Sequence, residues 1–298
     1  RWTAVRMAPA PVPPGALARL GGNVNGPSLV RTPDWLPGRL GRYHLYFAHH
    51  HGRHIRLAYA DSLEGPWTLW DPGTLRLEQT PCADHIASPD VHVDEDRREL
   101  RMYFHGRPAQ AGAARGPQAT YLARSLDGIH FASEPGVLGR PYLRAVPWRG
   151  QWLAVGRRGC LYRSPDGLQP FEPGPNPFAG GPFLLRHAAL RLEDDVLSVF
   201  HSCIGAAPEH IQVSHLRLNG DWSRWTASPP ATLLRPERIE EGADLPVAPS
   251  APGRARGPLH QLRDPAYFRE GPSEYLLYTL AGESGIGLAR LEPCPGAG

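Results

Sequence analysis

The sequence predicts an all-β protein that folds as a single five-bladed β-propeller. Two recurring strand patterns and a high content of the turn-forming residues Gly and Pro predict this fold class. The 298 residues include 33 Gly and 34 Pro, which would break long helices but are expected where tight turns join many short strands. No long helical period runs through the chain, and its repeats have the spacing of propeller blades.

The first recurring pattern is a β-hairpin. A short apolar strand is followed by a Gly-containing turn and by an aromatic residue that opens a second strand, and this combination predicts a hairpin. Clear copies occupy residues 57–67, 121–131 and 161–171, and a looser copy occupies residues 216–222.

Two further strands precede each hairpin. The strand directly before it is rich in aromatic and aliphatic residues and occurs at 43–48, 100–105, 151–156, 196–201 and 274–279. Ahead of that strand lies a segment with a polar start, at 25–30, 88–93, 142–146, 186–190 and 263–268. The repeating unit is therefore three or four strands long and occurs five times.

These units predict one domain over residues 1–298. The blades are expected at about 25–70, 85–133, 140–173, 183–228 and 259–292. The fifth unit lacks a clear fourth strand, and residues 1–10 are a candidate to supply it and close the ring. That closure stays open at this point, as does the alternative of a β-sandwich or two stacked sheets.

Composition excludes several classes of function. The net charge is +3 and there is no lysine; the arginines are spread among acidic residues, which argues against a nucleic-acid partner. No apolar run reaches 18 residues, so no membrane span is expected. The four cysteines are far apart and form no CxxC pair, which disfavours a thiolate zinc site. We expect a soluble protein, and its cytoplasmic or secreted location stays open, as does a removed signal peptide before Arg1.

Blade geometry predicts where polar residues converge. The first strand of each blade starts at one face of the channel, and the turn between the second and third strands returns to that face. A concave, titratable pocket is therefore expected there. The residues predicted to bind a ligand at this face are Asn25, His50, His85, His105, Arg144, Arg186, Arg263 and Glu283.

Three short motifs resemble a known group of propellers. Ser88-Pro89-Asp90-Val91 and Arg263-Asp264-Pro265-Ala266 are similar to the first-strand starts of five-bladed glycoside hydrolases, and residues 61–67 resemble their blade-closing hairpin. These are the arabinanase and xylosidase families grouped as family 43, with their levansucrase-like and family-117 anhydrogalactosidase relatives. The resemblance implies a sugar substrate and acid/base hydrolysis at the channel mouth.

The chain departs from the group where carboxylates are expected. Asn25 stands at the first-blade position of the base, and Arg144 stands near the third-blade aspartate. Arg186 and His187 stand where the fourth blade carries its acid. In the anhydrogalactosidase-like relatives a histidine acts as the acid, so the resemblance keeps His187 as a candidate.

The candidate catalytic residues are Asp264, Asp90, His187 and Glu209. Inverting hydrolysis needs an acid and a base about 6.5–9.5 Å apart, and Asp90 and Asp264 are expected at equivalent channel positions, with Arg263 keeping its neighbour ionised. His187 titrates near neutrality and suits a general acid. The alternatives are structural: aspartates that accept backbone N–H bonds, a histidine bonded to a carbonyl and a solvated glutamate in a turn.

The predicted function is a glycoside hydrolase that acts on a terminal furanoside or anhydro-sugar-like unit with inversion. The alternative is a propeller that binds carbohydrate without cleaving it, and a protein-interaction propeller would instead need an apolar mouth. The expected partner is an oligo- or polysaccharide. No cofactor and no metal ligands are predicted, although a divalent ion in the channel stays open, since one of His49, His50 and His51 could join His85 and His105 as ligands.

Overall fold

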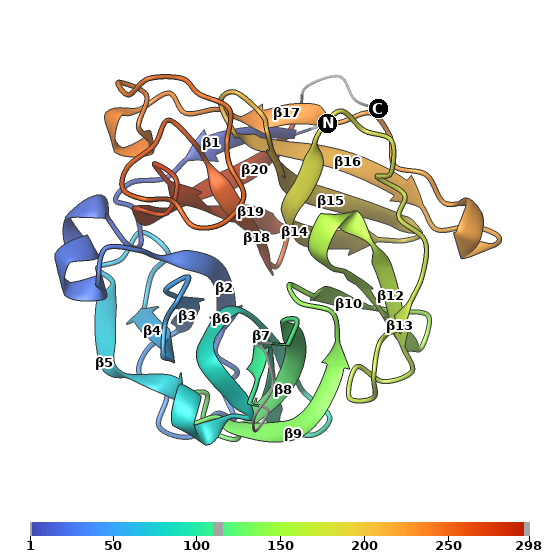
Figure 1. Cartoon of the computed structure of the whole chain (residues 1–298). Helices are drawn as coiled ribbons and strands as arrows, with labels where there is room; N and C mark the ends of the chain where they lie inside the picture. The colour runs from blue at the N-terminus through green and yellow to red at the C-terminus, as the bar shows by residue number, and fades with distance from the viewer. Residues whose placement is uncertain (1, 110–115, 295–298) are drawn as a thin grey trace. The chain divides into compact units, whose positions relative to one another are not determined.

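The computed structural model describes residues 2–109 and 116–294. It contains five four-stranded antiparallel sheets and confirms the predicted fold class, an all-β five-bladed β-propeller (Figure 1). Several of the loops contain short 3₁₀ turns. No helix in the described ranges is both long enough and apolar enough to cross a membrane. Cys82, Cys160, Cys203 and Cys294 are free thiols.

The chain divides into two compact units. One comprises Asn25–Arg157 and Tyr162–Pro173, and we call it the N-terminal unit. The other comprises Arg1–Val24, Arg158–Leu161 and Gly174–Gly298, and we call it the C-terminal unit. Each unit is built around buried apolar residues of its own strands, and each is described separately below.

The N-terminal unit holds three sheets in chain order. The first contains β2 (Asn25–Arg31), β3 (Tyr43–Ala48), β4 (His54–Ala60) and β5 (Thr68–Arg76). The second contains β6 (Cys82–Asp94), β7 (Glu99–Pro108), β8 (Ala119–Ser125) and β9 (Ala132–Gly139). The third contains β10 (Arg144–Trp148), β11 (Gln151–Val155), β12 (Leu161–Ser164) and β13 (Glu172–Pro173), with Leu161 assigned to the other unit.

The C-terminal unit holds two sheets. The first contains β14 (Leu184–Glu193), β15 (Val196–Ile204), β16 (Ile211–Arg217) and β17 (Ala231–Leu234). In the second, β18 (Arg263–Glu270), β19 (Ser273–Leu280) and β20 (Gly285–Pro293) are joined by β1 (Trp2–Arg6), which pairs antiparallel with β20. The first and last strands of the chain therefore lie in one sheet.

Burial explains the order of strands within each sheet. The second strands are almost entirely buried; every residue of β3 is buried, as a strand covered on both faces must be. The fourth strands are largely exposed, as in β5, where only Thr74 and Leu75 are buried. The apolar core of the N-terminal unit centres on side chains such as Tyr46, Ile55 and Phe104, and that of the C-terminal unit centres on Phe200 and Leu276.

A bulge interrupts the first strand of four sheets near its start. The register shifts between Asn25 and Ser28, Ala87 and Asp90, Leu185 and Ala188, and Arg263 and Ala266. In three of these bulges a left-handed residue precedes a proline: Gly26 with φ of 55°, Ser88 with φ of 49° and Asp264 with φ of 47°. A bulge re-aims the side chains next to it, so these positions decide which groups meet.

The bulges correct one expectation from the sequence. Asp264 precedes the bulge proline and aligns with Ser88, whereas Asp90 follows the proline and aligns with Ala266. The prediction that Asp90 and Asp264 occupy equivalent positions is therefore wrong. The shared Pro-Asp and Asp-Pro pairs suggested equivalence. The two bulges have the same register, so the carboxylates lie two residues apart because Asp90 follows its proline and Asp264 precedes its own.

Candidate functional site

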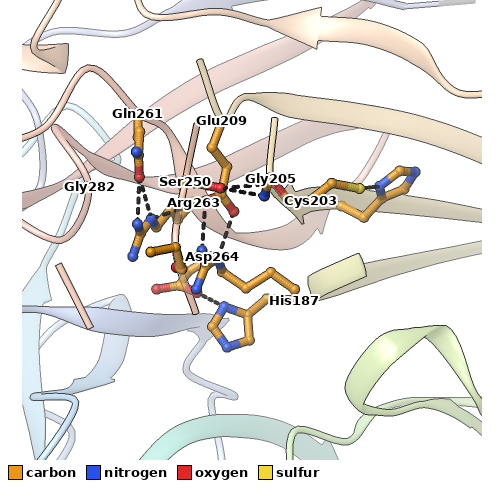
Figure 2. Close-up of polar contacts among 12 residues, drawn as sticks. His187, Cys203, Gly205, Glu209, Ser250, Gln261, Arg263, Asp264 and Gly282 are labelled. Carbon is orange, nitrogen blue, oxygen red and sulfur yellow. Dashed lines mark hydrogen bonds and ion pairs between the residues drawn. The ribbon is translucent and has the colours of Figure 1, made fainter. Parts of the chain in front are cut away.

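A buried aspartate and a histidine meet in the C-terminal unit. Nδ1 of His187 forms an ion pair with Oδ1 of Asp264. The Asp264 side chain is 1% exposed and the His187 side chain is 10% exposed, so the carboxylate lies behind the ring. Figure 2 shows that the second ring nitrogen points away from the carboxylate. Asp264 therefore faces the imidazole, and His187 is the more exposed member of the pair.

Two bulges bring this pair together. His187 lies inside the bulge of β14 and Asp264 lies inside the bulge of β18. The two strands belong to different sheets, so side chains aimed out of their ladders must bridge them. Asp264 also has a left-handed backbone, which costs a non-glycine residue of order 1 kcal/mol. Strain of this kind is concentrated at functional sites.

Glu209 is fully buried between two arginines. Its Oε1 accepts from Nε of Arg186 at 2.7 Å and its Oε2 accepts from Nη2 of the same residue at 3.0 Å. Nε of Arg263 lies 3.3 Å from Oε2, and the Glu209 side chain is 0% exposed. Both oxygens are therefore engaged by guanidinium groups, and the buried side chain presents neither of them to a ligand. This arrangement argues against the predicted role of Glu209 as an acid.

Arg263 does not face Asp264, in contrast to the sequence-based expectation. Its Nε donates to Gln261 Oε1 at 3.0 Å and its Nη1 donates to Glu283 Oε1 at 3.4 Å. Glu283 also accepts from the side chain of Asn23. Gln261, which nothing in the sequence singled out, is thus part of the network around the predicted ligand-binding residues Arg186, Arg263 and Glu283.

Asp90 in the N-terminal unit has three donors. Its Oδ2 accepts from the backbone N–H of Ala145 at 3.0 Å and from Nε2 of His92 at 3.0 Å, and its Oδ1 accepts from Arg144 at 3.4 Å. Burial alone would raise the pKa of the Asp90 carboxyl, but the charge of His92 and these donors hold it below its ordinary value. Asp90 is therefore ionised at neutral pH.

The backbone bond to Asp90 has a counterpart in the preceding sheet. Ser28 occupies the aligned position after the bulge, and its Oγ accepts from the backbone N–H of Val91 at 2.9 Å. Both side chains therefore tie one first strand to the next. No N–H of the described chain makes such a bond to Asp264. The structural alternative weighed for both aspartates holds for Asp90 and fails for Asp264.

Four predicted ligand-binding residues gather in the N-terminal unit. Nδ2 of Asn25 lies 3.4 Å from Nδ1 of His50, and the ring centroids of His85 and His105 are 5.9 Å apart. Burial lowers the pKa of His85 and lowers that of His105 well below its ordinary value, so both rings are neutral at pH 7. Asn25 is 1% exposed, and its Oδ1 has no hydrogen-bond partner within residues 2–109 and 116–294.

Further polar residues complete this cluster. His85 contacts Asp84 Oδ1 at 2.7 Å through Nδ1 and Gln118 Nε2 at 2.8 Å through Nε2. The two partners lie next to no recurring motif, so the sequence did not reveal them. Over the part of the chain that the structure describes, no three His, Cys, Asp or Glu side chains are grouped as metal ligands.

Solved structures share this fold at low sequence identity. An exo-1,5-α-L-arabinanase from a bovine ruminal metagenomic library is 12% identical, with 93% of this chain and 95% of that chain covered and a TM-score of 0.58. The family-43 enzyme from Xanthomonas citri is 10% identical, with 96% and 95% covered and a TM-score of 0.64. The β-xylosidase/α-arabinofuranosidase CoXyl43 from a compost metagenome, solved with xylotriose, is 11% identical, with 98% and 94% covered and a TM-score of 0.63.

These likenesses define the class: a five-bladed propeller with the fold of the family-43 glycoside hydrolases. No family model matches the chain. The chain belongs to the family of Uncharacterized protein R118 of Acanthamoeba polyphaga mimivirus. The two are 38% identical over 303 aligned positions, which cover 91% of this chain and 84% of the relative.

Proposed function

We propose that the protein is a glycoside hydrolase that uses His187 as its general acid and acts on a terminal furanoside or anhydro-sugar-like unit with inversion. One observation carries the proposal: a buried carboxylate, Asp264, orients an imidazole whose other nitrogen faces away from it. The fold shared with arabinanases and xylosidases supports a sugar as the substrate class.

The roles follow from the geometry of the pair. Protonated Nε2 of His187 gives its proton to the leaving oxygen as the glycosidic C–O bond breaks, while Asp264 holds the Nδ1 proton and stabilises the imidazolium form. The scheme also requires a group that accepts a proton from the attacking water. Asp90, the candidate from the sequence, is ionised, but it belongs to the other unit and accepts the backbone N–H of Ala145. Glu209 has no proton-transfer role in this scheme.

Paired substitutions test the acid assignment. Turnover of arabino-, xylo- and galacto-oligosaccharides and of chromogenic furanosides is measured for the wild type, His187→Gln and Asp264→Asn. Each substitution should lower kcat/KM at least about 100-fold, the typical contribution of general acid–base catalysis. The control is His130→Gln, because His130 also pairs with an aspartate, Asp127, but is 81% exposed. Full turnover in both site variants would refute the assignment.

A second candidate function is carbohydrate binding without cleavage. Asn25 favours it, because a neutral amide stands where the resemblance expects the base, and its buried Oδ1 suits a ligand hydroxyl. Isothermal titration with the same oligosaccharides distinguishes the two functions. Saturable binding with no product after long incubation supports the binding protein, whereas measurable turnover rejects it.

A further inference from the structure

We infer that Glu209 is a positioning residue for the Asp264–His187 pair. This inference rests on the proposed function, because it assigns the group that keeps the proposed acid in place. Arg186 directly precedes His187, and Arg263 directly precedes Asp264. Glu209 binds both arginines, so it links the two strand starts that carry the pair.

The need for such a link follows from the sheet topology. β14 and β18 lie in different sheets and share no ladder within the described residues. The backbone N–H of Leu262, directly before β18, donates to the carbonyl oxygen of Glu209 at 2.9 Å. Glu209 is therefore tied to the start of β18 by its main chain, and its side chain adds the contact with Arg186 at the start of β14. A displacement of about 1 Å at a catalytic group can cost about 100-fold in rate, so a rigid cross-link between the two bulges has a direct functional use.

Glu209 and the two arginines that it binds, Arg186 and Arg263, are called the clamp below. The clamp has the geometry of a rigid cross-link. Arg186 engages both oxygens of Glu209 at 2.7 and 3.0 Å, and a bidentate pair of this kind fixes orientation as well as distance. Nε of Arg263 forms an ion pair with Oε2 at 3.3 Å, while its N–H donates to Gln261 Oε1. The side chains of Arg186, Arg263 and Glu209 are 5%, 2% and 0% exposed, respectively. Burial at this level keeps water from competing for the donors.

A second acceptor is held by the same two guanidinium groups. The carbonyl oxygen of Gly253 accepts from Nη1 of Arg186 at 3.2 Å and from Nη1 of Arg263 at 3.3 Å. Arg186 Nη2 also donates to the carbonyl of Ala251 at 2.6 Å. The clamp thus joins the starts of β14 and β18 and also fastens the loop before β18 at two carbonyls.

A simpler role for Glu209 would be to neutralise two buried arginines. Both roles predict loss of stability when Glu209 is changed, so stability cannot separate them. The tautomer of His187 distinguishes the two roles. An imidazole whose Nδ1 faces a carboxylate carries its neutral-form proton on Nδ1, and loosening of that contact shifts the proton toward Nε2.

The experiment is ¹⁵N NMR of the ring nitrogens of the full chain, at a pH above the titration of imidazole. The His187 signals are identified by their loss in His187→Gln, and Asp264→Asn gives the reference for a broken contact. Glu209→Gln should shift His187 from predominantly Nδ1–H toward the ratio seen in Asp264→Asn. Arg186→Lys should do the same while it conserves every formal charge, because a lysine cannot form the bidentate fork.

The matched control is Glu241→Gln. Glu241 is another buried glutamate of the C-terminal unit, 1% exposed, that binds Arg6 through both oxygens, at 2.6 and 3.1 Å. The substitution should leave the His187 tautomer as in the wild type. A wild-type ratio in Arg186→Lys, or an equal shift in Glu241→Gln, would overturn the inference. If Glu209→Gln does not fold, Arg186→Lys alone decides.

The outcome is independent of turnover, since the measurement needs no substrate. A tautomer shift in a protein that cleaves no sugar would reject the glycosidase and retain the clamp. Turnover with a wild-type tautomer in Arg186→Lys would reject the clamp and retain the glycosidase.

Discussion

Two aspartates beside prolines have different surroundings in this protein. Asp90 accepts a backbone N–H and faces a histidine and an arginine, whereas Asp264 is 1% exposed and faces His187. The first carboxylate is thus held ionised by fixed donors, and the second orients an imidazole. The ionisation of Asp90 should therefore contribute to the pH dependence of the free energy of unfolding.

We expect Asp90→Asn to destabilise the protein by about 1–3 kcal/mol at pH 7, the usual cost of leaving buried charged partners uncompensated. The folded-state pKa of Asp90 is lowered, so its contribution is present above the unfolded pKa of about 3.9 and is lost as pH falls through that value toward the folded pKa. Urea unfolding at a series of pH values measures this.

The difference between Asp90→Asn and the wild type should therefore shrink on acidification. A constant difference down to pH values below the Asp90 titration would contradict the assignment.

The candidate residues could be predicted from the sequence, but their partners could not. Asp264 and His187 at first-strand starts, and Glu209 in a turn between a second and a third strand, were identified as candidates because blades bring those positions to one face. Which of them touch depends on side-chain direction. Glu209 and Arg186 are 23 positions apart, and nothing in their local sequence marks them as an ion pair rather than as acid and ligand-binding residue.

The bulges are the elements that decide these contacts. In the N-terminal unit the bulge of β2 approaches that of β6 closely: a Cβ added to Gly26 would lie 2.5 Å from Cα of Ser88. Gly26 also has a φ of 55°, where a side chain is strained. Glycine is thus required here for both conformation and space.

Substitution of this glycine should be costly. We expect Gly26→Ala to lower the free energy of unfolding by more than about 2 kcal/mol, from the left-handed conformation together with overpacking against a backbone. Gly38→Ala is the control, because Gly38 has a φ of 62° and nothing within 4 Å of an added Cβ; it should cost only about 1 kcal/mol. Chemical denaturation measures the free energy of unfolding of both variants. An equal loss in the two would show that the close approach to Ser88 adds no cost to the substitution of Gly26.

The strands were predictable from the sequence because their signals are local. Alternation, turn glycines and aromatic starts recur with each blade. The bulge register has no comparable signal: a proline after Gly26, Ser88 and Asp264 marks the place, but the inserted residue is defined only by pairing with the next strand. The separation of Asp90 from Asp264, in contrast, can be read from the sequence, because aligning the two prolines places the aspartates two residues apart.

At the scale of the whole chain, the path crosses repeatedly between the two units. It enters the N-terminal unit at Asn25, leaves at Arg158, returns at Tyr162 and leaves again at Gly174. Leu161 and Tyr162, neighbours in β12, fall in different units. We propose that residues 1–298 form one domain.

A single domain of this kind should unfold in one step. Differential scanning calorimetry should give a single transition whose calorimetric and van't Hoff enthalpies agree, the criterion for two-state unfolding. Urea unfolding followed by tryptophan fluorescence and by far-ultraviolet circular dichroism should give coincident curves. Two resolved transitions, or a van't Hoff enthalpy near half the calorimetric value, would instead make the units separate domains.

The pairing of β1 with β20 also has a consequence for synthesis. Of the strands that the structure describes, β1 is synthesised first and its partner β20 last, so Trp2 cannot pair with Pro293 until β20 has been made. Until then the Trp2 ring, which later lies 5.6 Å from that of Phe200, has no native surface to cover. Contacts between such distant positions slow folding. The nascent chain therefore carries β1 without its partner strand until β20 has been synthesised.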